Sequence, residues 1–435
     1  MTGGASANQK GGDRMRRRPA APRWAVVLAV AVLVAGGGAP RALAVAAGPA
    51  ALPALTPLVT LRMFTPTTGW AATAQAVLRT TDGGTAWRQV GPRAAGVAPF
   101  FLSAAAAWVA SPEGGGAGVQ VWRTTDGGTS WTVATLNVPA SALSLSLDFV
   151  NATDGWLLTG AASSSGPASA TLWRTTNGGA TWSAIYPAGQ AASAAAWPFG
   201  GSGAAIGFRG ALSGWAVVHP ADPGAPWLYR TGDGGRTWLP PARLPTTPAA
   251  RGAQVVTGLA PTFFGPLDGI LPVRLRPRGA AGTGGQALWV FYRTHDGGTT
   301  WVPGAPVPAQ AFIFLDPAHG FATVGPDLAA TADGGRTWRQ VPAHPPLGDI
   351  RVLDFVSPAL GWAVQRDRAQ GGWQLLHTAD GGRTWSPLPY GLEVETAGSV
   401  EAGPPRWAGH AFEGAVVLGL AAFVIWVERR SRAHR

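Results

Sequence analysis

The stretch RTTDGGTSW, from Arg123 to Trp131, has the composition of a tight turn between two β-strands. The carboxylate of Asp126 can accept hydrogen bonds from the backbone of its own turn, and the two glycines that follow can adopt the positive φ angles of a hairpin. Trp131 can then point inward and bury a large aromatic surface. A carboxylate held by backbone donors is poorly placed for acid–base chemistry, so this aspartate is predicted to be structural.

The same nine-residue pattern occurs seven times. The other copies are RTTDGGTAW at Arg79, RTTNGGATW at Arg174, RTGDGGRTW at Arg230, RTHDGGTTW at Arg293, ATADGGRTW at Ala330 and HTADGGRTW at His377. The turn positions are Asp82, Asp126, Asn177, Asp233, Asp296, Asp333 and Asp380, and the tryptophans are Trp87, Trp131, Trp182, Trp238, Trp301, Trp338 and Trp385. Such regular recurrence indicates that one supersecondary unit is repeated along the chain.

A second pattern precedes each turn: an apolar strand, a tight turn and usually Gly-Trp. It begins at Phe64, Phe101, Phe149, Phe208, Phe263, Phe314 and Phe355. The third unit is the clearest, and its alternating apolar residues predict four strands over Leu143 to Val150, Trp156 to Thr159, Thr171 to Thr175 and Thr181 to Tyr186. Four antiparallel strands per repeat are the unit of a β-propeller blade, so the sequence predicts an all-β, seven-bladed propeller.

The seven turns resemble Asp-box repeats, also called BNR repeats, and the resemblance covers roughly residues 58–390. Such repeats are found in sialidases, sortilin-type receptors, some endoglucanases and a seven-bladed family named for a photosystem II assembly and stability factor. Asn177 departs from the usual aspartate, and Ile270 and Phe321 replace the tryptophan of Gly-Trp in two units. The resemblance is specific for fold, whereas function does not follow from fold alone.

Composition and charge restrict the possible functions. The chain contains no cysteine, which excludes disulfides, thiolate catalysis and cysteine-bound metal. The net charge of +11 is concentrated in the tails: residues 1–44 carry +6 and residues 428–435 carry +3, which leaves +2 for the long middle. The charge distribution therefore argues against nucleic acid as a partner.

Both ends of the chain carry membrane-related signals. A basic region and a short apolar run precede Ala42-Leu43-Ala44, which resembles a secretory signal cleaved after Ala44, with an uncleaved anchor as the alternative. Residues 407–427 are mostly apolar and are followed by Arg429 and further arginines, which predicts a transmembrane helix with a cytoplasmic tail. A buried core helix is the alternative for that segment.

The predicted organisation comprises six parts. They are a signal peptide or N-terminal anchor at 1–44, a linker at 45–57, the Asp-box propeller at 58–390, a linker at 391–406, the membrane span at 407–427 and a cytoplasmic basic tail at 428–435. The nearly lysine-free composition, rich in Ala, Arg, Gly and Pro, is typical of a GC-rich bacterial genome. The expected location is therefore a bacterial cell membrane, crossed once, with the propeller outside the cytoplasm.

A candidate binding site lies in the loops opposite the repeated turns, where propeller sites normally occur. The arginines of this candidate site are Arg274, Arg276, Arg278, Arg366 and Arg368. In RLRPRG the first three alternate, so at period two they would share one strand face. Carboxylates in equivalent loops are Glu113, Asp222, Asp327, Asp349 and Asp367. The arginines form either a basic patch for an acidic partner, lipid headgroup or glycan, or ordinary solvated loop charge.

Two classes of function compete. A sialidase-like enzyme would need a tyrosine nucleophile, but Tyr186, Tyr229, Tyr292 and Tyr390 are all predicted to pack within strands or at strand ends, and sialidases have six blades. Endoglucanase relatives enclose a carboxylate cleft between two propellers, whereas this chain is long enough for one. We therefore predict a non-enzymatic scaffold, assembly or receptor protein that binds a macromolecule, with a protein as the expected partner and without cofactor or metal. A glycoside hydrolase or glycan-binding protein is the alternative.

Overall fold

The structure is a computed structural model that describes most of the repeat region. The described residues are 58–94, 96–113, 118–138, 142–161, 169–186, 204–218, 228–239, 244–245, 253–276, 287–366, 372–388 and 391–393. All of them belong to one compact unit of the chain. None of these residues is helical, so this part of the chain contains no helix that could cross a membrane. The predicted signal segment, membrane span and basic tail lie outside the described residues.

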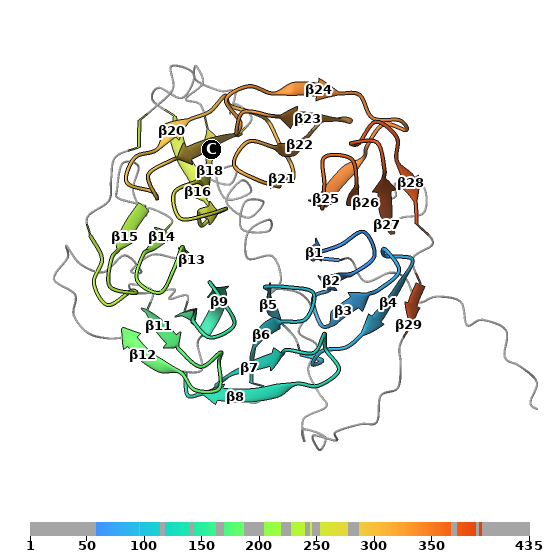
Figure 1. The fold of residues 1–435 in the computed structure, drawn as a ribbon. Coiled ribbons are helices and arrows are strands. Elements are labelled where there is room, and N and C mark those ends of the chain that lie inside the picture. The colour runs from blue at the N-terminus through green and yellow to red at the C-terminus, as the bar shows by residue number, and fades with distance from the viewer. Residues whose placement is uncertain are drawn as a thin grey trace, which may run out of the picture. The chain divides into compact units, whose positions relative to one another are not determined.

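Seven sheets, antiparallel except where a fifth strand joins the edge of blade 1, form the blades of a β-propeller (Figure 1). Blade 1 contains β1 (Thr60–Met63), β2 (Gly69–Ala72), β3 (Val77–Thr80), β4 (Ala86–Gln89) and, at its outer edge, β29 (Gly391–Glu393). Blade 2 contains β5 (Ala98–Phe101), β6 (Ala107–Pro112), β7 (Val119–Thr124) and β8 (Thr132–Leu136). Blade 3 contains β9 (Ala142–Phe149), β10 (Gly155–Ala161), β11 (Ser169–Thr175) and β12 (Ser183–Tyr186).

The remaining blades follow the same order with small variations. Blade 4 contains β13 (Ala204–Phe208), β14 (Gly214–Val218) and β15 (Leu228–Thr231). Blade 5 contains β16 (Gln254–Gly258), β17 (Thr262–Phe263), β18 (Gly269–Arg276), β19 (Leu288–Thr294) and β20 (Val302–Pro303). Blade 6 contains β21 (Phe312–Phe314), β22 (Gly320–Val324), β23 (Asp327–Thr331) and β24 (Arg339–Val341). Blade 7 contains β25 (Asp349–Phe355), β26 (Gly361–Arg366), β27 (Trp373–Thr378) and β28 (Ser386–Pro387).

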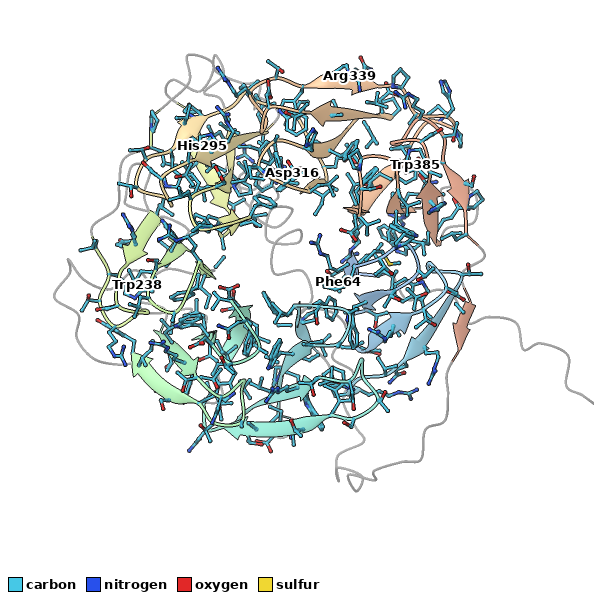
Figure 2. All side chains as sticks on the ribbon, viewed as in Figure 1. Phe64, Trp238, His295, Asp316, Arg339 and Trp385 are labelled. Carbon is cyan, nitrogen blue, oxygen red and sulfur yellow. The ribbon has the colours of Figure 1, made fainter. Side chains whose placement is uncertain are left out.

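The prediction of an all-β, seven-bladed propeller is confirmed. In the third unit, all four observed strands overlap the predicted ones and differ from them by at most two residues at each end. Blade 4 departs from the predicted four strands, because its fourth strand is reduced among the described residues to a single bridge between Arg230 and Leu239. Figure 2 shows the radial order of the strands: Phe64, just after β1, lies toward the centre, and Arg339 on β24 lies at the outer rim.

The repeated turns all lie on one side of the ring. In every blade, the first glycine of the turn donates its backbone N–H to a carbonyl in the hairpin between the blade's first two long strands; the donors are Gly83, Gly127, Gly178, Gly234, Gly297, Gly334 and Gly381. We call this side the turn face. Because neighbouring strands are antiparallel, the loops between the second and third strands lie on the opposite side. We call that side the loop face.

The ring is closed between blade 7 and blade 1 without a covalent link at the inner strands. Trp362 on β26 donates its indole N–H to the carbonyl of Gly83 in blade 1, at 2.8 Å. The carboxylate of Asp354 on β25 accepts a hydrogen bond from the backbone N–H of Met63 on β1, at 2.6 Å. At the outer edge, β29 pairs in parallel with β4, so residues expected to form a linker add a fifth strand to blade 1.

Apolar side chains fill the space between neighbouring blades. The seam between blades 7 and 1 joins Leu61 and Trp87 to Trp362 and Leu375 in one buried cluster. The seam between blades 3 and 4 stacks Trp156 on Phe208, with ring centroids 3.7 Å apart. Burying such aromatic surface stabilises the seams, because each indole removes a large apolar area from water.

Candidate functional site

The arginines of blade 5 extend from the loop-face end of β18. Arg274 lies opposite Thr257 and Trp289, and Arg276 lies opposite Gln254. Both arginine side chains are half-buried, and Leu275 between them is buried, as expected when alternate residues share a strand face. Arg278 lies outside the described residues. The described part of this segment therefore has the alternation that the sequence predicts.

The arginines of blade 7 lie among an aromatic ring and a carboxylate. Arg366, at the exposed end of β26, pairs across the sheet with Asp349 on β25 and Trp373 on β27. The guanidinium carbon of Arg351 lies 5.4 Å from the centroid of the Trp373 ring, within cation–π distance. Burial lowers the pKa of Arg351, and the nearby carboxylate of Asp349 opposes that change. This blade presents two cations beside one carboxylate at the loop face.

Blade 6 separates these two groups of arginines, so the arginines do not lie on adjacent blades. Arg368 of the predicted site lies outside the described residues. Of the predicted loop carboxylates, Asp222 and Asp367 also lie outside them. Asp327 in blade 6 accepts hydrogen bonds from the Gln340 side chain at 2.6 Å and the backbone N–H of Ala343 at 3.1 Å, which gives it a structural role.

The aspartates of the repeated turns accept hydrogen bonds from residues of their own turns. In blade 2 the carboxylate of Asp126 accepts hydrogen bonds from Thr124 Oγ1 at 2.8 Å, from the Ser130 backbone N–H at 3.0 Å and from the Ser130 hydroxyl at 2.5 Å. The Ser130 hydroxyl, followed by the other donors, lowers the pKa of Asp126 from 3.8 to about 2. Asn177 occupies the equivalent position in blade 3, where its Oδ1 accepts from the backbone N–H of Thr181 at 2.9 Å.

The tryptophans of these turns are buried to different degrees. Trp87, Trp238, Trp301 and Trp385 are buried, whereas Trp131, Trp182 and Trp338 are half-buried. Trp131 packs against the edge of blade 1, with its ring centroid 6.4 Å from that of Trp70. A tryptophan at this position therefore contributes to the seam between blades as well as to its own blade.

The threonine two residues before each turn aspartate, or before Asn177 in blade 3, is a structural residue that the sequence analysis did not identify. These residues are Thr80, Thr124, Thr175, Thr231, Thr294, Thr331 and Thr378, and all are buried. In blade 4, Thr231 Oγ1 donates to Asp233 at 2.8 Å and accepts from the backbone N–H of Gly235 at 2.9 Å. The presence of threonine at this position in all seven copies of the turn could have indicated this role from the sequence.

Replacing Thr231 with valine should destabilise the ring by ~1–3 kcal/mol, because the buried N–H of Gly235 would lose its acceptor without any change in side-chain shape. Thr231→Ser keeps the hydroxyl and should therefore lose less folding stability than the valine variant. Urea denaturation followed by tryptophan fluorescence measures both variants. Equal losses in the two variants would show that the methyl group, and not the hydroxyl, stabilises the turn.

The tryptophans of Gly-Trp connect neighbouring blades, which the sequence did not reveal. Trp108 donates its indole N–H to the carbonyl of Gly178 in blade 3 at 2.8 Å, and Trp156 donates to that of Gly234 in blade 4 at 2.9 Å. An arginine on the third strand packs over the same ring in several blades, as Arg79 does over Trp70 at 4.7 Å. Each of these turns thus receives a donor from the blade before it.

Two aspartates on inner strands make equivalent contacts between blades. Asp354 in blade 7 is 1% exposed, and burial raises its pKa to about 6 although Arg62 favours the charged form. Asp148 in blade 3 accepts from the backbone N–H of Phe208 in blade 4 at 2.6 Å, and burial raises its pKa to about 7. Both aspartates occur in the sequence Leu-Asp-Phe, and this shared sequence could have indicated their equivalent positions.

Two histidine–aspartate pairs lie on the turn face. His295 Nδ1 lies 2.6 Å from Asp268 in blade 5, and His319 Nδ1 lies 2.9 Å from Asp316 in blade 6. All four side chains are more than 40% exposed, so water screens both pairs. Within the described ranges, no three side chains of histidine, aspartate or glutamate are grouped to hold a metal ion.

The fold and the blade contacts define a seven-bladed β-propeller built from repeats, and solved structures share this architecture. The GH74 enzyme from Niastella koreensis superposes with a TM-score of 0.51 at 16% identity, covering 77% of this chain and 54% of that enzyme. The chain therefore spans about half the length of that enzyme. YCF48 from Cyanidioschyzon merolae has a TM-score of 0.45 at 18% identity, covering 68% of this chain and 85% of YCF48.

An ulvan lyase of polysaccharide lyase family PL25 has a TM-score of 0.43 at 12% identity, covering 76% of this chain and 94% of the lyase. No family model matches the sequence, and no curated protein matches it. At these identities the structural likeness shows the fold alone.

Proposed function

We propose that this chain is a membrane-anchored, extracytoplasmic Asp-box propeller that acts as a binding scaffold for assembly or reception, with an acidic partner held at the loop face. The observation that carries the proposal is the pair Arg274 and Arg276 on one face of β18, at its loop-face end. Arginine suits carboxylate and phosphate partners, because its planar fork donates two parallel hydrogen bonds.

The positions of the carboxylates favour binding over hydrolysis. Glycoside hydrolysis requires two free carboxyl groups on either side of a bond. On the described loop face, Asp327 is held by two donors of its own blade, and Asp349 lies across the sheet from Arg366. The turn aspartates are held by their own backbone. These positions support a structural or charge-balancing role for the carboxylates, rather than a catalytic one.

Changing Arg274, Arg276 and Arg278 together to serine should weaken partner binding and reduce its dependence on salt, because exposed charge contacts are screened beyond ~8 Å at physiological ionic strength. A matched control replaces Arg236, Arg336 and Arg339, three exposed arginines of the turn face and outer rim, and loses the same charge. The control variant changes exposed side chains and should remain folded, since surface substitutions usually change stability by less than about 0.5 kcal/mol each. Because Arg274 and Arg276 are half-buried, urea denaturation of the test variant establishes that it is folded before its binding is compared.

The measurement is capture of cross-linked partners from membranes by the full-length tagged chain, over a series of salt concentrations. Equal capture by the test and control variants would contradict a binding site at β18. The same preparations can be incubated with glycan substrates. Turnover that disappears in the single variant Asp349→Asn would favour the hydrolase instead.

A further inference from the structure

We propose that the turn face of blades 4 and 5 is a contact surface between two copies of this chain, related by a two-fold axis. The inference goes beyond the proposed function, because it concerns the turn face and none of the loop-face arginines. Three observations support it: where the exposed apolar side chains lie, how the two blades are joined at this surface, and how its charges are arranged.

Exposed apolar side chains gather on two neighbouring blades. Among the described residues, five large apolar side chains are about half exposed, and four of them belong to blades 4 and 5. These four are Leu212 at 55%, Leu239 at 56%, Leu267 at 53% and Val302 at 51%. The fifth is Val133 in blade 2, at 49%. Single exposed apolar residues are common on protein surfaces, whereas a group of them marks a site of contact.

The four residues occupy two positions that recur in every blade. Leu212 and Leu267 are the hairpin residues whose carbonyls accept the N–H of the first turn glycine. Leu239 and Val302 directly follow the turn tryptophan. In the other five blades the hairpin residue is Thr67, Ala105, Thr153, Ala318 or Ala359. The residue after the tryptophan is Arg88, Thr132, Ser183, Arg339 or Ser386. The blade therefore requires a large apolar residue at neither position, and both positions become apolar in the same two blades.

The hairpins that carry Leu212 and Leu267 are joined at this surface. Blades 4 and 5 are neighbours in the ring (Figure 1), and one buried apolar cluster fills their seam. Arg209 in the hairpin of blade 4 donates a hydrogen bond to the carbonyl of Pro266 in the hairpin of blade 5. Its guanidinium carbon also lies 5.8 Å from the centroid of the Phe263 ring. The two leucines therefore belong to one continuous surface. We call the surface of Leu212, Leu239, Leu267 and Val302 the apolar patch.

The charged side chains beside the apolar patch differ between the two blades. Blade 4 has Arg209 in its hairpin and the exposed Arg236 in its repeated turn, where blade 5 has uncharged residues. Blade 5 instead has Asp268, whose side chain is 42% exposed, next to His295. The other turn-face charges are shared by the two blades: Asp233 and Arg230 in blade 4, and Asp296 and Arg293 in blade 5. The patch therefore has a more cationic side on blade 4 and a more anionic side on blade 5.

This arrangement of charges is complementary to itself. A two-fold axis that lies in the contact plane, along the boundary between blades 4 and 5, places blade 4 of each copy over blade 5 of the other. Leu212 then faces Leu267 of the second copy, and Arg236 lies on the side of the second copy's Asp268. A partner with a single sign of charge would be repelled by one of the two blades. A second copy of this chain avoids that repulsion, because it forms the same pair of opposite charges twice.

Cross-linking of single cysteines tests the contact in the full chain, because the chain contains no cysteine of its own. Ala211→Cys places an exposed thiol beside Leu212. Thr67→Cys is the matched control, since Thr67 is exposed and occupies the position in blade 1 that corresponds to Leu212. The purified full chain in mild detergent is treated with a short bismaleimide and separated on a denaturing gel. The Ala211→Cys chain should form a covalent dimer, and the Thr67→Cys chain should stay monomeric.

A second substitution in the Ala211→Cys chain tests the apolar contact. Leu267→Ser should raise the protein concentration needed for half-maximal cross-linking by about tenfold or more, since the two-fold axis removes the side chain from both copies. Val133→Ser is the matched control, because that side chain is also half exposed but lies in blade 2. It should leave the cross-linking unchanged. Urea denaturation establishes that each variant is folded before its cross-linking is compared.

Reversal of charge tests the two-fold pairing without changing the apolar patch. Arg236→Asp alone and Asp268→Arg alone each bring like charges together across the contact, so each should reduce the dimer. The double variant exchanges the two charges and should recover the dimer, because opposite charges again face each other. A single variant that cross-links like the wild type, or a double variant that does not recover, would overturn the two-fold arrangement.

Two further results would overturn the inference as a whole. The first is equal cross-linking at positions 211 and 67, or a dimer that persists unchanged in Leu267→Ser. The second is a cross-linked product in cell extracts whose mass differs from that of two chains, without a dimer of the purified chain, because the patch would then bind a different protein. None of these results bears on the loop-face arginines, so the proposed function is tested separately.

Discussion

Replacing Trp362 with alanine should destabilise the propeller by ~3–5 kcal/mol and open the seam between blades 7 and 1. The indole is fully buried, and it belongs to the apolar cluster that joins the two blades. Its removal leaves a cavity and also deprives the carbonyl of Gly83 of its donor. The chain does not link the two blades at the inner strands, so after removal of the indole the seam depends on the remaining inner-strand contacts and, at the outer edge, on the pairing of β29 with β4.

Trp108→Ala is the matched control, because Trp108 is equally buried and makes the equivalent bond to Gly178 across the seam between blades 2 and 3. Both variants should show a similar loss of stability in chemical denaturation. Hydrogen exchange distinguishes them: amides of β1 and β25 should exchange faster in Trp362→Ala only. Equal protection of β1 and β25 in the two variants would show that β29 and the inner-strand contacts close the ring without the indole.

The second large effect concerns pH and the buried carboxyl of Asp354. Burial raises its pKa from 3.8 to about 6, so between these values the folded state holds a proton that the unfolded state has released. The stabilisation that the folded state gains by holding the proton on Asp354 is full below pH 3.8. It is lost as the pH rises to about 6, and it stays lost at higher pH. One pKa unit corresponds to about 1.4 kcal/mol, which gives ~3 kcal/mol over this interval.

Asp354→Asn should remove this loss, because the amide carries no charge and its oxygen can still accept from the N–H of Met63. The variant should match the wild type near pH 4 and be more stable near pH 8. Denaturation midpoints across this pH range measure the difference between the two proteins. Asp349→Asn on the same strand is the control, since it also removes one carboxylate, but from a side chain that is exposed in the folded protein. If Asp354→Asn showed the same pH dependence of stability as the wild type, the attribution of this dependence to Asp354 would be wrong.

The sequence predicted the blades well because each blade is built from local information. In the third unit, alternation of apolar and polar residues located β9 to β12 to within two residues, since side chains of a strand alternate between its faces. The turn at Asp126 was also predicted with its backbone donors, because all partners lie within four residues in sequence. Local hydrogen bonds of this kind follow from residue types and spacing.

The candidate site was predicted only in part. The alternation of Arg274 and Arg276 on one strand face follows from period two and is present in β18. The neighbours of Arg366, namely Asp349 and Trp373, come from strands paired across a sheet, and their register depends on how the strands align. That register depends on the hydrophobic pattern of the paired strands and on the turns between them, which the spacing of arginines does not encode.

The sequence alone therefore determined the class of fold, the number of blades and the positions of the seven turns, because these depend on periodicity and on contacts within a few residues. The tertiary structure decided how the ring closes: Trp362 reaches Gly83 across 279 residues, Asp354 reaches Met63 across 291, and β29 pairs with β4. These contacts join opposite ends of the chain. Their partners are selected by the geometry of a closed ring, in which the last blade must fit against the first.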